Sequence, residues 1–85
     1  MSGTVHLNIR LFAVLREHAG TDGLALSVPV GTSVKRLLVL VREAAPALGP
    51  YLEATRVAVN LAFAPPEQEL KHGDDVALIP PVGGG

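Results

Sequence analysis

One helical pattern, flanked on both sides by strand patterns, places the strongest constraint on the fold of this chain. Apolar side chains recur every three or four positions and form a single stripe, made of Val34, Leu37, Leu38, Val41 and Ala45. Thr32 or Ser33 can cap the first turn by accepting a hydrogen bond from a free backbone amide. Pro46 disfavours helical geometry at the residue before it, so we expect the helix to end near Ala45.

Alternating segments on either side of this helix predict strands with one buried face. Residues 5–12 (VHLNIRLF) and 24–28 (LALSV) carry an apolar side chain at every second position. Residues 76–79 are apolar on both faces, which is typical of a strand in the middle of a sheet.

The segment that follows the helix, residues 56–62 (RVAVNLA), alternates as well. Its buried face is expected to carry Val57, Val59 and Leu61. The link between the first two strands, residues 13–22, is too long for a tight hairpin turn, and we expect it to be a loop.

The expected order is two strands, one helix and two further strands. A helix with a single apolar stripe must lie across one face of a sheet, which gives a two-layer α+β domain. This order resembles the β-grasp, or ubiquitin-like, fold, in which one main helix packs on one face of a mixed four-to-five-stranded sheet. The first and last strands of that fold are adjacent at the centre. We expect residues 1–81 to form this domain and residues 82–85 to form a flexible glycine tail.

Composition excludes several classes of function. The 85 residues carry seven basic and eight acidic side chains, with a formal charge of −1. No run of like charge stands out, so neither a nucleic-acid partner nor a membrane surface is expected. The chain has no cysteine, which excludes disulfides, thiolate zinc sites and cysteine catalysis. Without a signal sequence or a membrane-spanning run, the expected location is cytoplasmic.

Side chains with catalytic or metal-binding chemistry form no recognisable pattern. His6, His18 and His72 lack the spacing of a helical ligand pair, and we interpret them as exposed polar positions in a strand, a loop and a turn. Asp74 and Asp75 follow a glycine and are interpreted as turn residues. The Gly-Thr-Ser segment before the helix is too little for a phosphate loop. We therefore expect neither a catalytic centre built from side chains nor a metal site.

The carboxyl end offers a different chemistry, in which the backbone terminus itself is the reactive group. Pro80 and Pro81 have a fixed φ and direct the chain away from the last strand, and the four residues after them reach roughly 13 Å. The final glycines lack a Cβ and fit a narrow channel in a partner. A terminal carboxylate joined to AMP becomes an anhydride that a sulfur nucleophile attacks, which yields a thiocarboxylate. The alternative is a frayed end without a function.

Three segments of the sequence carry a resemblance to a known family. Residues 72–85 (HGDDVALIPPVGGG) resemble the end of the small, sulfur-carrying subunit of molybdopterin synthase, with its terminal P-P-V-x-G-G pattern. Residues 10–22 (RLFAVLREHAGTD) are similar to the first strand and following loop of that family, and residues 57–63 (VAVNLAF) to its central V-N segment. The similarity covers nearly the whole chain.

The resemblance implies a function for the tail. An E1-like activating enzyme would use ATP and Mg²⁺ to adenylate Gly85, a sulfur donor protein would supply sulfur, and the chain itself would bind no cofactor. Gly83 and Gly84 would enter the larger synthase subunit. There the thiocarboxylate would deliver sulfur to cyclic pyranopterin monophosphate and build the dithiolene that binds molybdenum.

The resemblance also implies contacts with these partners outside the glycines. They fall at Phe12, Arg16 and Ile79 and at the residues that lead into the tail, Pro80, Pro81 and Val82. We expect Phe12 and Ile79 on the face of the sheet without the helix, where they would form an exposed apolar patch.

Other functions remain open on this sequence. A related sulfur carrier would feed thiamine synthesis or tRNA thiolation, since those relatives also end in Gly-Gly. A ubiquitin-like protein modifier would be conjugated to lysine side chains through the same activated glycine. A plain β-grasp binding module with an idle tail would need none of this chemistry.

Overall fold

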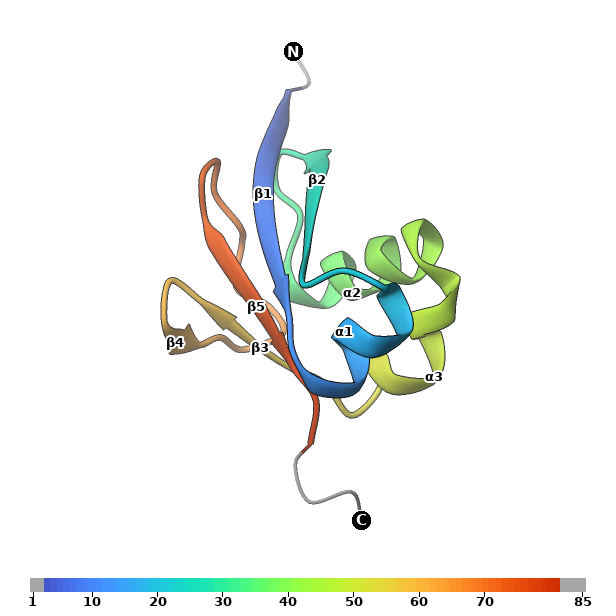
Figure 1. The fold of residues 1–85 in the computed structure, drawn as a ribbon. Coiled ribbons are helices and arrows are strands. Elements are labelled where there is room, and N and C mark those ends of the chain that lie inside the picture. Colours follow the sequence, from blue (N-terminus) through green and yellow to red (C-terminus); the bar gives the residue numbers. More distant parts are fainter. Residues whose placement is uncertain (1–2, 82–85) are drawn as a thin grey trace.

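In the computed structural model, which describes residues 3–81, five strands form one mixed sheet and helices cover one of its faces (Figure 1). The elements in chain order are β1 (Thr4–Leu11), α1 (Ala13–Ala19), β2 (Gly23–Pro29), α2 (Val34–Ala44), η1 (Pro46–Leu48), α3 (Gly49–Leu52), β3 (Arg56–Val59), β4 (Ala62–Phe63) and β5 (Asp75–Ile79). The predicted α+β fold is confirmed, and α1, η1, α3 and β4 are additions to the predicted order. Every helix within residues 3–81 is too short or too polar to span a bilayer.

The first and last strands lie side by side at the centre of the sheet, as predicted. The strand order is β2-β1-β5-β3-β4, with β1 and β5 parallel and the other neighbouring pairs antiparallel. The central position of β5 explains why both of its faces are apolar. Val76 and Leu78 are fully buried against the helices, whereas Ala77 and Ile79 on the opposite face are half-buried.

Helix α2 forms where the apolar stripe predicted it. Ser33, and not Thr32, is the N-cap, since its Oγ accepts a hydrogen bond from the amide of Arg36 at 3.1 Å. The helix ends at Ala44. The next residue, Ala45, has left helical geometry (φ −138°, ψ 77°), because the proline after it excludes that geometry.

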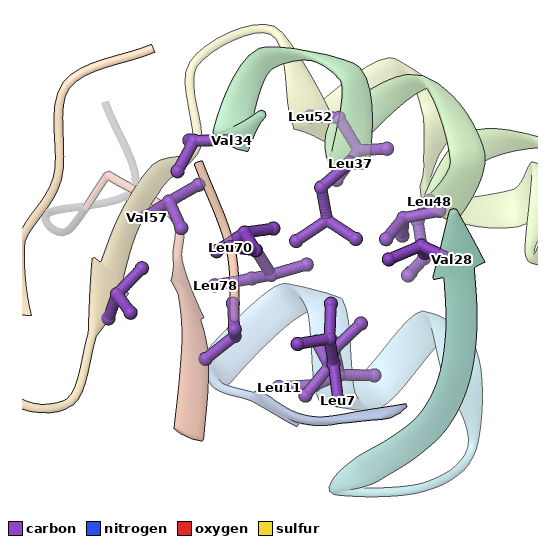
Figure 2. Close-up of a cluster of buried hydrophobic side chains, with 14 of the residues drawn as sticks. Leu7, Leu11, Val28, Val34, Leu37, Leu48, Leu52, Val57, Leu70 and Leu78 are labelled. Atoms are coloured by element: carbon purple, nitrogen blue, oxygen red, sulfur yellow. The ribbon is translucent and has the colours of Figure 1, made fainter. Parts of the chain in front are cut away.

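The core lies between the helices and the sheet. Figure 2 shows side chains of α2 and of the segment after it pointing toward those of the strands. The strands contribute Val5, Leu7, Ile9, Leu11, Val28, Val57, Val59, Val76 and Leu78. The helices contribute Leu15, Val34, Leu37, Val41, Leu48 and Leu52. The alternation in the sequence therefore identifies the buried face of β1 correctly, and that of β3 as far as Val59.

One predicted loop is wrong, because residues 13–22 contain helix α1. The helix ends at Ala19, and its C-cap Gly20 takes the left-handed conformation (φ 73°) and donates its amide to the carbonyl of Arg16. Leu15 is fully buried and anchors α1 in the core. Seven residues with one fully buried side chain are too short a pattern for periodicity to reveal a helix. His18, expected in a loop, consequently lies on α1.

The predicted burial of Leu61 is also wrong. Val57 and Val59 are buried as expected, but β3 ends at Val59 and Leu61 is 98% exposed. Asn60 and Leu61 form a two-residue turn into β4, and both have a positive φ, 51° and 72°. The alternation in the sequence continues across a point where the chain reverses, so it no longer follows one face of the sheet.

Candidate partner-binding surface

The face of the sheet without helices carries an apolar groove of about 270 Å³, which we call the open-face groove. Its lining residues are Arg10, Phe12, Ala58, Leu61, Phe63, Asp75, Ala77 and Ile79. Four large apolar side chains are exposed within residues 3–81, and three of them, Phe12, Leu61 and Phe63, line this groove. Exposed apolar side chains gathered in one place are typical of an interaction surface or a ligand-binding groove.

The strand register builds the floor of the groove. Ala58 on β3 pairs with Ala77 on β5, and the same row continues to Phe63 on β4 and Arg10 on β1. The two alanines have short side chains, so this row is lowest in its middle, between the ring of Phe63 and the guanidinium of Arg10. Ile79 lies two residues further along β5, toward the tail.

The charged groups around the groove are already engaged. Nε of Arg10 lies 3.3 Å from Oδ1 of Asp75, and the two side chains are 66% and 43% exposed, so this solvent-accessible ion pair adds little to stability. The guanidinium of Arg56 lies 4.0 Å from the centroid of the Phe63 ring, a cation–π contact that orients this ring on the short strand β4. An apolar centre with paired charges at its margin suits a protein partner.

The structure brings only some of the expected partner residues together. Phe12, 43% exposed, and the half-buried Ile79 both line the groove. Arg16 is exposed on α1 and is not among the residues that line it. Pro80 is buried, whereas Pro81 is exposed. Contact of these residues with a partner stays a prediction.

The remaining expected site residues lie outside the described part of the chain. These are Val82, Gly83, Gly84 and Gly85. Their roles in tail insertion and in carrying sulfur, and the flexibility expected of residues 82–85, likewise stay predictions.

Sequence reasoning did not identify Phe63 and Leu61 as surface residues. The signal that could have found them is Asn60, since asparagine followed by one residue between two short strand-like runs marks a tight turn. A turn at this point places Leu61 at its tip and brings Phe63 back along the sheet, opposite Ala58.

The turn that carries Leu61 is tied to the start of β5. Asn60 donates its amide to the carbonyl of Asp75 at 2.8 Å and its Nδ2 to Oδ1 of Asp74 at 2.9 Å. The amide of Asp75 donates in return to Oδ1 of Asn60 at 2.9 Å. Oδ2 of Asp74 also accepts from the amide of Lys71 at 2.7 Å, so the interpretation as a turn residue is confirmed for Asp74. It is wrong for Asp75, which is the first residue of β5 and pairs with Asn8 on β1.

The histidines are exposed and make structural contacts. The amide of His6 donates to Nδ1 of His72 at 3.1 Å, with the two rings edge to face at 5.3 Å. The ring of His18 stacks on Tyr51, and its Nε2 lies 2.9 Å from the Tyr51 hydroxyl. Within the described residues, no group of three His, Cys, Asp or Glu side chains is placed to hold a metal ion.

The first amides of α2 are fully used. Val34 and Lys35 donate to the carbonyls of Gln68 and Pro66, each at 2.9 Å, and the third amide donates to the capping serine. A phosphate at a helix N-terminus needs such amides free. The Gly-Thr-Ser segment is therefore a helix cap and not a phosphate loop.

The strand order and the helices on one face define a ubiquitin-like β-grasp protein, with an apolar groove on the face opposite the helices. The chain belongs to the ThiS family, which matches residues 9–85.

Individual proteins resemble the chain over nearly its full length. The molybdopterin synthase sulfur carrier subunit of Chlamydomonas reinhardtii is 32% identical over 83 residues, which cover 95% of this chain and 100% of that protein. The crystal structure of SAMP1, small archaeal modifier protein 1, from Haloferax volcanii is 30% identical, with a TM-score of 0.85 over 94% of this chain and 99% of that one. The fold also matches a complex of subunits 1 and 2 of the molybdopterin-converting factor from Helicobacter pylori, at 22% identity, a TM-score of 0.68, and coverage of 95% of this chain and 100% of that one.

Proposed function

We propose that this chain is the sulfur carrier subunit of a molybdopterin synthase. The observation that carries the proposal is the match to a molybdopterin synthase sulfur carrier subunit at 32% identity over 95% of the chain. The segment Pro80–Gly85 supports it, because two prolines and a valine lead into three glycines. The open-face groove supports it as well, since it offers a docking surface on the strand from which this segment continues.

In this proposal the reactive group is the backbone carboxylate of Gly85. One of its oxygens attacks the α-phosphorus of ATP on an E1-like activating enzyme that uses Mg²⁺, and pyrophosphate leaves. Hydrosulfide, or an equivalent from a sulfur donor protein, then attacks the carbonyl carbon; a C–S bond forms, the C–O bond to AMP breaks, and AMP leaves. The resulting thiocarboxylate carries the sulfur to cyclic pyranopterin monophosphate in the larger synthase subunit.

Incubation with an activating enzyme, MgATP and sulfide is expected to replace one terminal oxygen with sulfur. Mass spectrometry of the intact protein would show the corresponding increase in mass, and a variant that lacks Gly83, Gly84 and Gly85 would show none. Addition of the larger subunit and precursor then distinguishes molybdopterin formation from thiamine or tRNA thiolation. The activating enzyme must first be shown to modify its own cognate carrier. If that enzyme then leaves the mass of the wild-type protein unchanged, the result would contradict all of these carrier functions.

The groove is the proposed docking surface for the larger synthase subunit. Its exposed rings, Phe12 and Phe63, are large apolar anchors of the kind that dominate protein interfaces. Ile79 links this surface to the tail, since it is the last residue of β5 and lines the groove. A subunit that covers the groove is thus positioned to receive the residues that follow.

Phe63→Asp is expected to weaken binding of the larger subunit by roughly 100-fold or more, because it removes a large apolar anchor and would bury a carboxylate in the interface at a cost in desolvation. The ring is 56% exposed in the free protein, so the fold should tolerate the change. Isothermal titration calorimetry measures the affinity. Val30→Asp is the matched control, since Val30 is 61% exposed but does not line the groove. Equal affinity of Phe63→Asp and wild type would remove the groove from the interface.

A second candidate, a protein modifier, is favoured by the likeness to small archaeal modifier protein 1, with its TM-score of 0.85. In that function a lysine Nζ attacks the activated carbonyl of Gly85, AMP leaves, and an isopeptide bond forms. Isopeptide-linked adducts that disappear when Gly83, Gly84 and Gly85 are deleted would favour the modifier. Sulfur exchange without such adducts would favour the carrier.

A further inference from the structure

Leu61 is a residue that the fold itself does not explain. Its backbone is in the left-handed region (φ 72°), where a Cβ crowds the backbone and glycine is preferred. Its side chain is 98% exposed and so adds no packing to the core. In a two-residue turn with positive φ at both positions, Asn-Gly is the favoured pair, whereas this chain has Asn60-Leu61. A residue that favours positive φ, such as glycine, would therefore stabilise the fold better than leucine does at this position.

The turn that presents Leu61 is held in one conformation. Asn60 shares three hydrogen bonds with Asp74 and Asp75, of 2.8, 2.9 and 2.9 Å. On either side of the turn, Val59 and Ala62 are paired in the sheet. A side chain on such a turn loses little backbone freedom when a partner binds it, so it is preorganised for contact.

Leu61 lies at the end of the groove that is remote from the tail. Strand β5 runs from Asp75, which is bonded to the turn, to Ile79, after which the chain continues into the tail. Both Leu61 and Ile79 line the groove, so a partner that spans it meets the leucine at one end and the start of the tail at the other. A contact at the turn end acts on recognition and not on the sulfur chemistry.

We infer that Leu61 is a specificity contact, whose side chain inserts into an apolar pocket of the larger synthase subunit when that subunit covers the open-face groove. The inference rests on the proposed function, and it names a residue that selects the partner. The larger subunit is the expected partner because Leu61 and Phe63 line the same groove. A subunit that covers the ring of Phe63 therefore also reaches Leu61. The leucine is then buried only in the complex.

Leu61→Gly tests this with two measurements on one variant. Its melting temperature is expected to rise by about 4 °C, since glycine relieves the left-handed strain. Its affinity for the purified larger subunit is expected to fall by about 10- to 100-fold, the effect of leaving one apolar side chain out of a pocket. A merely structural role for Leu61 would move the two quantities in the same direction.

Two further variants distinguish a loss of affinity caused by removal of the Leu61 side chain from one caused by a more flexible turn. Leu61→Asn tolerates positive φ and keeps the turn ordered, so it should lose affinity as glycine does. Leu61→Met keeps an apolar side chain of similar volume and should retain affinity. If Leu61→Gly lost affinity while Leu61→Asn bound normally, the loss would be due to flexibility of the turn. That result would overturn the inference.

The binding results test the Leu61 contact separately from the proposed function. Wild-type protein that binds the larger subunit, together with Leu61→Gly that binds equally well, would refute the specificity contact and leave the proposed function standing. Wild-type protein that fails to bind the subunit would contradict the docking itself, and the specificity contact with it.

Discussion

Gly84→Val is expected to slow sulfur transfer to the precursor by about 100-fold or more while the free energy of unfolding stays unchanged. Valine adds a branched Cβ, which restricts φ and widens a chain that glycine keeps narrow. In the proposed function the tail places the thiocarboxylate against the precursor, and a misplacement of about 1 Å costs roughly 100-fold in rate. The buried core lies between Val5 and Leu78, so unfolding should not respond to the change.

The measurement is the rate of dithiolene formation by the larger subunit, started with protein already converted to the thiocarboxylate. This design separates insertion of the tail from its activation. Gly83→Ala is the matched control, because Gly83 occupies the variable position of the P-P-V-x-G-G pattern. This variant should retain most of the rate. A Gly84→Val protein that transfers sulfur normally, or that loses stability in proportion to its rate, would refute the separation of tail and domain.

Leu15→Ala is expected to lower the free energy of unfolding by about 2–5 kcal/mol, a large part of the stability of a small domain. Leu15 is fully buried and is the residue that ties α1 to the core. Its truncation leaves a cavity beneath a seven-residue helix that is too short to persist without packing.

Urea unfolding followed by circular dichroism measures this change, provided that the dependence on denaturant stays the same. Glu17→Ala, on the exposed side of the same helix, is the control and should change stability by less than about 0.5 kcal/mol. If the two variants were equally stable, α1 would not be anchored as described.

Periodicity predicts the elements that are long and have one buried face. Strand β1 has a strict alternation over eight residues, and α2 has a full apolar stripe with a capping serine and a terminating proline. These two elements, with a last strand that is apolar on both faces, were enough to predict a helix on one face of a mixed sheet. The adjacency of the first and last strands at the centre of the sheet rests on fold analogy and is confirmed.

The features that the sequence did not predict depend on contacts between residues that are far apart in the sequence. Helix α1 exists because Leu15 reaches a core built mostly from later residues. Leu61 breaks the alternation because Asn60 is bonded to Asp74 and Asp75, fourteen and fifteen positions away. The groove depends on the register of four strands, so Phe63 could be placed beside Ala58 and Ala77 only once pairing was known.

The central position of β5 has a consequence for biosynthesis on the ribosome. Asp75–Ile79 joins β1 to β3, yet it is the last strand of the fold to be translated. A nascent chain that lacks it holds two separate strand pairs, and the groove is incomplete without Ala77 and Ile79. A partner that recognises this groove would therefore not bind chains in which β5 has not yet been added to the sheet.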